Sequence, residues 1–163
     1  MIRLAQNSDL EGIVTIYNQA IEARFQTGFT EGFKTEDRLE WFDEHSPLTH
    51  PLYVYEANGM VAGWLSISPY RSGRAALRFT AEVSYFIHTD HRQQGIGNAL
   101  LQHAIANCGE LNIKTLLAII IDRNAASINL VKKLGFEQWA YLPSVAEFDG
   151  VECSHVYYGL RVS

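Results

Sequence analysis

Two glycines one residue apart lie in the segment Arg92-Gln93-Gln94-Gly95-Ile96-Gly97-Asn98, between a strand-like run and a helical pattern. Glycine lets the backbone turn tightly and leaves no side chain between its N–H groups and a ligand. A helix that starts here adds unpaired N–H donors and the positive end of its dipole. The segment therefore predicts a seat for a pyrophosphate group, although a tight turn that binds nothing has the same spacing.

Two common nucleotide-binding motifs do not fit this segment. The dinucleotide fingerprint requires a third glycine at position 100, where the chain has Leu100. The phosphate-binding loop that ends in Gly-Lys-Ser/Thr is excluded as well, because neither Gly95 nor Gly97 is followed by lysine. The pattern that does fit is Arg/Gln-x-x-Gly-x-Gly/Ala.

This pattern resembles the pyrophosphate loop of the GNAT superfamily of acetyl-CoA-dependent N-acetyltransferases. Downstream, Asn124–Ser127 and Lys133–Phe136 look like the family's Asn-x-x-Ala and Lys-Leu-Gly-Phe motifs. Upstream, Thr80–Ile87 is similar to the Thr-Val-Glu-His-Ser-Val-Tyr-Val strand of the phosphinothricin and methionine sulfone acetyltransferase branch, and Ile16-Tyr17-Asn18 also resembles that branch. The resemblance covers nearly the whole chain and is more specific than the loop alone.

The resemblance implies an α/β fold with a central mixed, mostly antiparallel sheet of six to seven strands. About four helices would flank the sheet, and a splayed parallel pair of strands would form the cofactor site. The implied reaction moves an acetyl group from acetyl-CoA to the primary amine of a small molecule, with an amino acid or its analogue as one option. Acetylation of a peptide or protein amine, and a non-catalytic acyl-CoA sensor, stay open as alternatives.

Glu82 matches the catalytic glutamate of the family and is predicted to be the general base, directly or through one water. An ammonium group must lose a proton before its nitrogen can attack, and a carboxylate can accept that proton. Because apolar residues flank Glu82 on its strand, desolvation should raise its pKa toward a working range. The competing interpretation is an exposed glutamate on the solvent face of an edge strand.

By the same resemblance, the end of this strand and two later segments hold the cofactor. A backbone N–H near Phe86 or Ile87 would stabilise the thioester oxygen, and the strand would hydrogen-bond the pantetheine arm. Asn124 would reach the pantetheine or only cap its helix. The predicted cofactor-binding set is Phe86, Ile87, Arg92, Gln93, Gln94, Gly95, Ile96, Gly97, Asn98, Asn124 and Lys133.

One position departs from the family pattern. Where the family often has a tyrosine, or this branch a histidine, as the acid for the leaving sulfur, the chain has Val131. Either a thiol with a pKa of about 8.5 departs as a thiolate with little help, or another donor replaces the missing acid. Tyr85, Tyr141 and Tyr157 are the candidate donors, and weak dependence on any acid is the favoured hypothesis.

The acceptor site is predicted from arginines just before the catalytic strand. Arg71 and Arg74 lie where the resemblance to the related branch implies a clamp for the carboxylate of an amino-acid substrate. A guanidinium can hold a carboxylate through two parallel hydrogen bonds. Phe29 would form a wall of the pocket. The alternatives are that the two arginines are only solvated loop residues and that Phe29 is only a core residue. His88 and His91 have no third ligand near them in sequence, so no metal is expected.

Apolar periodicity and turn signals order the elements around these motifs. Ser8 and Glu11 have the spacing of a capping box, and Thr35 is a candidate cap for a short second helix. Asn58-Gly59 predicts a hairpin, and Asn124 a helix cap. The expected strands are 2–5, 52–57, 60–67, 79–88, 115–121, 136–142 and 153–161, and the expected helices are 8–21, 35–42, 95–108 and 124–135.

The composition of the 163 residues, with a net charge of −5, favours one domain over residues 1–163 and disfavours nucleic acid as a partner. The longest apolar run is far shorter than the ~20 residues of a membrane helix, so no membrane partner is expected. Two cysteines without metal-binding spacing are consistent with the cytoplasm. A homodimer through an apolar strand edge near the C-terminus is expected from family analogy only.

Overall fold

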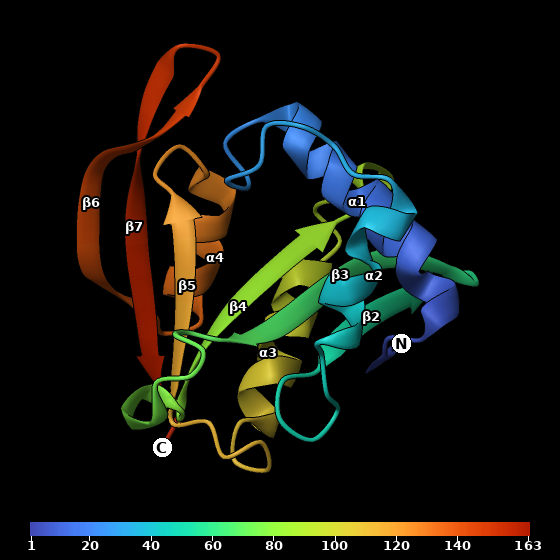
Figure 1. Cartoon of the computed structure of the whole chain (residues 1–163), viewed down its shortest axis with the longest axis horizontal. Coiled ribbons are helices and arrows are strands. Elements are labelled where there is room, and N and C mark those ends of the chain that lie inside the picture. The colour runs from blue at the N-terminus through green and yellow to red at the C-terminus, as the bar shows by residue number, and fades with distance from the viewer.

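Seven strands form one sheet in the computed structural model, which describes residues 1–163 (Figure 1). The spatial order is β1-β2-β3-β4-β5-β7-β6, and β4 and β5 are the parallel neighbours in an otherwise antiparallel sheet. The expected mixed, mostly antiparallel sheet is therefore confirmed. The strands are β1 (Ile2–Leu4), β2 (Leu52–Ala57), β3 (Met60–Pro69), β4 (Thr80–Ile87), β5 (Thr115–Ile121), β6 (Glu137–Phe148) and β7 (Val151–Arg161).

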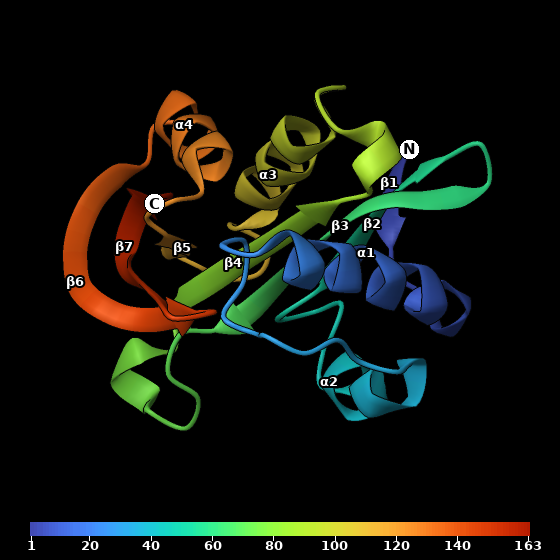
Figure 2. The ribbon, with the colours of Figure 1, turned by 90° about the horizontal axis from the view of Figure 1, so that it is seen from above.

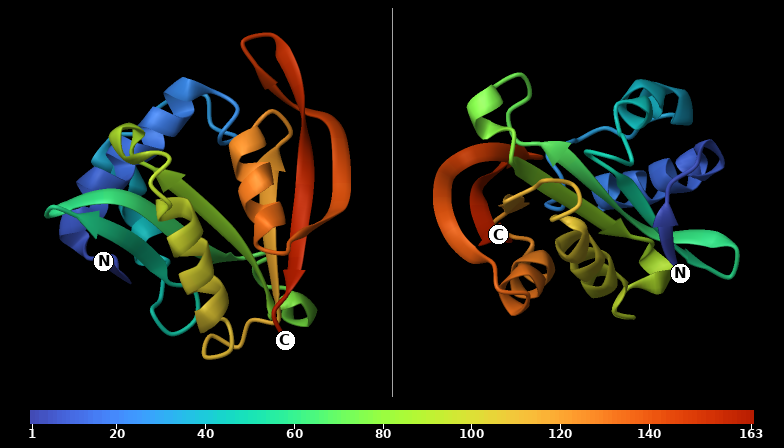
Figure 3. Two further views of the ribbon diagram at one scale, coloured as in Figure 1. Left: turned by 180° about the vertical axis from the view of Figure 1, so that it is seen from behind. Right: turned by 90° about the horizontal axis from the view of Figure 1, so that it is seen from below.

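Four α-helices cover the sheet, two on each face (Figures 2 and 3). Helices α1 (Leu10–Ala23) and α2 (Leu39–Asp43) lie on one face, and α3 (Ile96–Asn107) and α4 (Ala125–Lys133) lie on the other. Four short 3₁₀ turns complete the chain: η1 (Asn7–Asp9), η2 (Thr35–Arg38), η3 (Ala75–Leu77) and η4 (Thr89–His91). The predicted element order is confirmed. None of the helices has the length and apolar character that a membrane-spanning helix needs.

Each face of the sheet has its own apolar cluster. The larger one lies under α3 and α4 and includes Leu65, Leu100 and Val131, whereas the smaller one lies under α1 and includes Ile13 and Trp64. Burial on both faces explains why β5 is a continuous apolar run. The two clusters fix which side chains of β4 point toward which pair of helices.

Glycine at position 63 of β3 allows α3 to approach the sheet closely. A Cβ atom at Gly63 would lie 2.9 Å from side-chain atoms of both Ile87 and Ile96. No real Cβ contact is that short, so a larger residue would push the start of α3 away from β4. The first turn of α3 is thereby held against the end of β4.

The start of α1 differs from the predicted capping box. Helix α1 begins at Leu10, and Ser8 lies inside the turn η1. Asp9 is the N-cap residue of α1, but its carboxylate makes no cap hydrogen bond to that helix. It accepts the backbone N–H of Gln6, at the start of η1, at 2.7 Å and two hydrogen bonds from Arg3 at 2.7 and 2.9 Å. This pairing with Arg3, a strand residue, is a tertiary contact that overrides the local Ser8 and Glu11 signal.

Two hairpin turns and the start of η2 differ in how well they match the sequence pattern. Asn58 and Gly59 both adopt positive φ angles, 52° and 74°, so the Asn-Gly hairpin is confirmed. Thr35 is not a cap: it lies in η2, whose first turn is fixed by the Asp37 carboxylate accepting the Lys34 N–H at 2.9 Å. Strands β6 and β7 are longer than predicted because Asp149-Gly150, an Asp-Gly hairpin signal, joins them.

The loop that follows α1 crosses to the far hairpin. Arg24 and Phe25 are two consecutive non-glycine residues with positive φ angles, each 62°. The Arg24 side chain pairs with Asp149 at 3.0 Å, and the Phe25 ring lies 5.3 Å from the ring of Phe148, edge to face. This loop therefore links the α1 side of the molecule to the tip of the β6–β7 hairpin.

Candidate active site

Strands β4 and β5 separate part-way along their length. They pair at three positions, Thr80 with Thr115, Ala81 with Leu116 and Glu82 with Leu117, and no further. Beyond Glu82, β4 continues to Ile87 while the two strands diverge (Figure 1). Backbone groups of β4 on the β5 side are consequently left without a strand partner, and Glu82 lies at the point where the splay begins.

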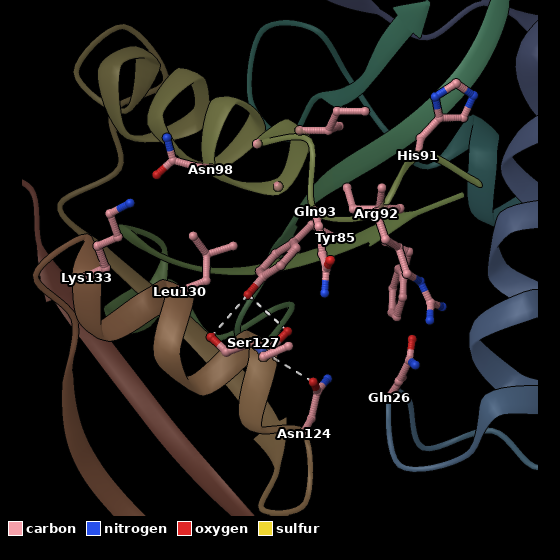
Figure 4. A pocket seen from close by; sticks show the side chains of 16 residues that line it. Gln26, Tyr85, His91, Arg92, Gln93, Asn98, Asn124, Ser127, Leu130 and Lys133 are labelled. Carbon is pink, nitrogen blue, oxygen red and sulfur yellow. Dashed lines mark hydrogen bonds between the residues drawn. The ribbon is translucent and has the colours of Figure 1, made fainter. Parts of the chain in front are cut away.

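A cavity of about 590 Å³ occupies the space beside this splay (Figure 4). Its walls are the end of β4, the loop before α3, the first turns of α3, one face of α4 and the loop after α1. The lining residues are Gln26, Tyr85, Phe86, Ile87, His91, Arg92, Gln93, Gly95, Ile96, Gly97, Asn98, Asn124, Ala126, Ser127, Leu130 and Lys133. All the predicted cofactor-binding residues except Gln94 lie on this wall.

The glycine loop has the geometry that an anion seat requires. Gly95 adopts φ of +79° immediately before α3, and a Cβ added there would meet nothing within 4 Å. At Gly97 an added Cβ would lie 3.1 Å from the Leu130 side chain on the opposite wall. Gln94 is exposed and bonds instead to the Asp90 carbonyl at 3.4 Å. The loop thus keeps its backbone bare where it faces α4.

Two polar side chains in the cavity have unused hydrogen-bonding capacity. The Asn98 Oδ1 atom is buried and has no partner in the protein. Asn124 caps α4 as predicted, because its Oδ1 accepts the Ser127 N–H at 3.3 Å, and its amide nitrogen remains free to donate. Lys133 supplies an exposed cation at the other end of α4. The cavity therefore offers the Asn124 amide as a donor and the Lys133 positive charge to a long polar ligand, whereas the Asn98 oxygen is closed off from solvent.

Glu82 lies on the opposite face of β4 from the core under α3 and α4. Ala81 and Val83 enter that core, whereas Phe86, on the same face as Glu82, packs in the cluster under α1. Burial raises the pKa of the Glu82 carboxyl, and no basic side chain or hydrogen bond opposes the shift. The interpretation of Glu82 as an exposed residue of an edge strand is wrong, because β4 is a central strand and Glu82 is mostly buried.

Residues from distant segments surround Glu82 on this face. Burial raises the pKa of Tyr157, the nearby Tyr70 and Glu82 add to the effect, and Arg71 opposes it. Glu82 and Arg71 are thus both close enough to Tyr157 to act on its charge. The arrangement brings a carboxylate and an exposed arginine to the same side of the sheet.

The other predicted acceptor residues are less closely tied to Glu82. Phe29 is 42% exposed and packs edge to face on Tyr17 and Phe33 under α1. Arg74 is exposed and its guanidinium contacts only the nearby Ser72 carbonyl, at 3.5 Å. His88 and His91 lie edge to face with ring centroids 5.7 Å apart, and no group of three or more metal-ligating side chains is formed.

Several lining residues were absent from the predicted set. Ala126, Leu130 and Lys133 follow one another at helical spacings of four and three, so the face of α4 could have been derived from Asn124 and Lys133. Gln26 had no such signal, because it belongs to a connecting loop whose path depends on the contacts of Arg24 and Phe25. Sequence reasoning found the wall formed by motifs and missed the wall formed by the loop.

The comparison with protein families decides the class of this site. Residues 16–136 match the model of the Acetyltransferase (GNAT) family. The chain belongs to this family. The resemblance inferred from the loop, the β4 segment and the α4 segment is thereby confirmed, and this GNAT protein is an N-acetyltransferase.

Individual relatives of this acetyltransferase cover most of its length. YwnH of Bacillus subtilis (strain 168), provisionally named a phosphinothricin acetyltransferase, is 44% identical over 91% of each chain. The L-methionine sulfoximine/L-methionine sulfone acetyltransferase of Salmonella typhimurium is 34% identical over 88% of this chain and 84% of its own. The structure of yncA from Salmonella typhimurium with its cofactor acetyl-CoA is 31% identical, with a TM-score of 0.93 over 100% of this chain and 94% of that one.

Proposed function

We propose that this acetyltransferase moves an acetyl group from acetyl-CoA to the amino group of a small amino acid or amino-acid analogue. The observation that carries the proposal is the position of Glu82, in the last β4–β5 pair, where the splay beside the cavity begins. The relative from Salmonella typhimurium named for L-methionine sulfoximine and sulfone supports an acceptor of this class. Both of those compounds carry an α-amino and a carboxylate group.

The cavity residues fit the proposed cosubstrate. The bare backbone at Gly95 and Gly97, with the start of α3 behind it, would hold the diphosphate, and Arg92 would add positive charge. Unpaired backbone groups of β4 would bind the pantetheine arm as an added strand, helped by the free amide of Asn124. Lys133 would face a phosphate of the nucleotide. Acetyl-CoA supplies the acetyl group as a thioester at the splay.

Glu82 would prepare the amine for attack. An ammonium group that enters on the α1 face meets a carboxylate whose raised pKa makes it a better proton acceptor than an ordinary glutamate. The proton moves to a Glu82 oxygen directly or through one water, and the nitrogen lone pair becomes available. A backbone N–H of β4 near Phe86 or Ile87 would stabilise the negative charge that develops on the carbonyl oxygen.

Arg71 would select acceptors that carry a carboxylate. It is exposed, and it lies close enough to Tyr157 to lower the pKa of that phenol, which Glu82 raises. A planar guanidinium binds a carboxylate through two parallel hydrogen bonds and would orient the amino group toward Glu82. Arg74 and Phe29 are proposed as outer contacts of this acceptor site.

A thiol-release assay tests the proposal against its two alternatives. Purified protein is mixed with acetyl-CoA and, separately, with amino acids, methionine sulfone, polyamines and short peptides. We expect turnover with amino acids or the sulfone. Turnover with peptides alone would identify a peptide acetyltransferase, and tight cofactor binding without any turnover would identify a sensor.

The variant Gly97→Trp tests the proposed diphosphate seat. Its indole would enter the space between α3 and Leu130, and acetyl-CoA binding measured by calorimetry should be abolished. Gly109→Trp is the matched control, because Gly109 is exposed and an added Cβ meets nothing within 4 Å. Normal affinity in a folded Gly97→Trp variant would contradict the seat.

The assembly and location complete the proposal. The edge strand β6 carries Trp139, Tyr141 and Val145 with about half of each side chain exposed, at 47%, 55% and 53%, and this edge would pair two copies into a homodimer. Both cysteines are free thiols, as expected in the cytoplasm. Light scattering of the purified protein measures the mass, and a monomer at all concentrations would contradict the dimer.

A further inference from the structure

The cavity wall carries a phenol, that of Tyr85, beside the splay of β4 and β5. Val131 of α4, which stands where the family often has an acid, is fully buried in the core and has no donor. One turn earlier on the same helix, Ser127 faces the cavity and meets the hydroxyl of Tyr85 (Figure 4). A side chain of β4 thus brings a hydroxyl to the cavity wall next to α4.

The other tyrosines considered from the sequence are not in this position. The Tyr141 hydroxyl donates to Ser154 Oγ at 3.0 Å, on the β6–β7 hairpin. Tyr157 lies near Glu82 and Arg71, on the face where the amine would enter. Tyr85 and Ser127 supply the side-chain hydroxyls on the cavity wall. The choice among the three tyrosines is therefore made by geometry.

The Tyr85 hydroxyl is held between the splay and the start of α4. It contacts Ser127 Oγ at 3.1 Å and the Ser127 carbonyl at 3.5 Å. The Ser127 N–H is bonded to the side chain of Asn124, which would bind the pantetheine arm. Tyr85 is three residues beyond Glu82 on β4, so its ring lies alongside the stretch of strand that would guide the arm toward the carboxylate.

We propose that the Tyr85 hydroxyl donates a hydrogen bond to the sulfur as the C–S bond breaks, and thereby stabilises the thiolate. This inference rests on the proposed function. The amine nitrogen, which has given one ammonium proton to Glu82, forms the C–N bond, and the carbonyl carbon releases the sulfur with the electron pair of the C–S bond. The nitrogen then loses its second proton to solvent, which leaves the neutral amide. The thiolate leaves as such and takes a proton from solvent afterwards.

The chemistry of the phenol suits a donor that keeps its proton. Burial raises the pKa of Tyr85 to about 12, and the bond to Ser127 opposes the shift. A phenol this weakly acidic stays protonated at neutral pH, whereas a thiol has a pKa of about 8.5, so complete transfer to the sulfur is unfavourable. Tyr85 therefore acts through a charge-assisted hydrogen bond.

Ser127 is the positioning residue for this phenol. A serine hydroxyl both donates and accepts, so Ser127 Oγ can accept the Tyr85 proton in the free protein and donate to the phenol oxygen once Tyr85 turns to the sulfur. The two hydroxyls would then form a short chain of hydrogen bonds from Ser127 on α4 through Tyr85 to the sulfur. Loss of the Ser127 hydroxyl should weaken the effect of Tyr85 without removing it.

The test compares the binding of free CoA with that of desulfo-CoA, which lacks the sulfur, by calorimetry from neutral to alkaline pH. In the wild-type protein, stabilisation of the thiolate should make CoA gain affinity relative to desulfo-CoA as the pH rises. In Tyr85→Phe this gain should shift to higher pH by about one unit, equal to a tenfold weaker thiolate interaction. Tyr141→Phe is the matched control and should behave as wild type.

Rate measurements complete the test. Tyr85→Phe should lower kcat about tenfold with little change in the KM for acetyl-CoA, and Ser127→Ala should fall between this variant and wild type. Ser127→Thr, which keeps the hydroxyl, should restore the binding difference. An unchanged pH dependence in folded Tyr85→Phe would overturn the proposal for Tyr85 alone, whereas failure of wild-type protein to bind either CoA compound would overturn the proposed function.

Discussion

Asp9, just before α1, and Glu82, on the central strand β4, are two carboxylates withdrawn from solvent, and their surroundings are opposite. Asp9 accepts two hydrogen bonds from Arg3 and one from the Gln6 backbone. Burial alone would raise the pKa of Asp9, but these partners outweigh it and the pKa is lowered. Glu82 has burial without partners, and its pKa is raised.

The difference separates a structural carboxylate from a reactive one. Paired and hydrogen-bonded, the Asp9 charge fixes β1 to the start of α1 and has little capacity left for another ligand. A buried carboxylate without partners lowers the stability of the fold, because the desolvation free energy of its charged form is not offset. Such groups are typical of functional sites. Substitutions of Glu82 and of Asp9 should therefore differ in their effects on the reaction rate and have opposite effects on the stability of the fold and on how that stability depends on pH.

The largest expected effect is on the rate of Glu82→Gln. The amide cannot accept the ammonium proton, so kcat/KM for the amine should fall about 10²-fold or more, while calorimetry should give unchanged affinity for acetyl-CoA. In the wild-type protein, kcat/KM should rise with pH through the raised pKa of Glu82, and the variant should lack that rise. Turnover equal to wild type would remove Glu82 from the mechanism.

The same variant should be more stable than the wild-type protein at neutral pH. Because folding raises the Glu82 pKa above 4.5, the folded state binds the proton more tightly than the unfolded state. Wild-type stability therefore falls as the pH rises from 4.5 through the raised pKa. Gln carries no charge to bury. The melting temperature of Glu82→Gln should therefore exceed that of wild type at pH 7, and the excess should vanish below pH 4.5.

Asp9→Asn should have the opposite effect on stability and none on the chemical step. The variant leaves Arg3 without its buried partner, and denaturant unfolding should show a loss of about 2–3 kcal/mol. Folding lowers the pKa of Asp9 below 3.8, so the stabilisation is complete above that pH and is lost as the pH falls through the lowered value. A wild-type melting temperature for Asp9→Asn at neutral pH would contradict the comparison.

The smallest effect is expected at the acceptor arginines. Arg71→Ala should raise the KM for an amino acid about tenfold, because a charge-assisted pair with the carboxylate is lost. Arg74→Ala is the matched control, since Arg74 contacts only Ser72, and should change KM much less. For an amine without a carboxylate, both variants should match wild type. Equal effects of the two variants on the amino acid would contradict the assignment of Arg71.

The parts that the sequence predicts well are those whose signals are local. The glycine loop, the Asn124 cap and the apolar run of β5 depend on neighbouring residues, and each forms as expected. The wall of the cavity followed from these motifs because a strand, a turn and a helix that are adjacent in the chain are also adjacent in space.

The parts that it misses depend on contacts between distant segments. Ser8 lost the capping role because Asp9 pairs with Arg3 on β1, and Gln26 reaches the cavity along a loop fixed by other residues. The side of the sheet on which Glu82 lies also follows from packing, because alternation along β4 says which residues share a face but not which helices cover it.

The loop after α1 bounds the splay at its open end. Three pairings join β4 to β5 at the closed end, and the Arg24–Asp149 and Phe25–Phe148 contacts bridge the two halves of the sheet beyond it. Separating the α1 side of the molecule from the β6–β7 hairpin would therefore break an ion pair and a ring contact. A ligand that lies in the cavity is thus bordered by a loop, through Gln26, that is anchored to the far hairpin.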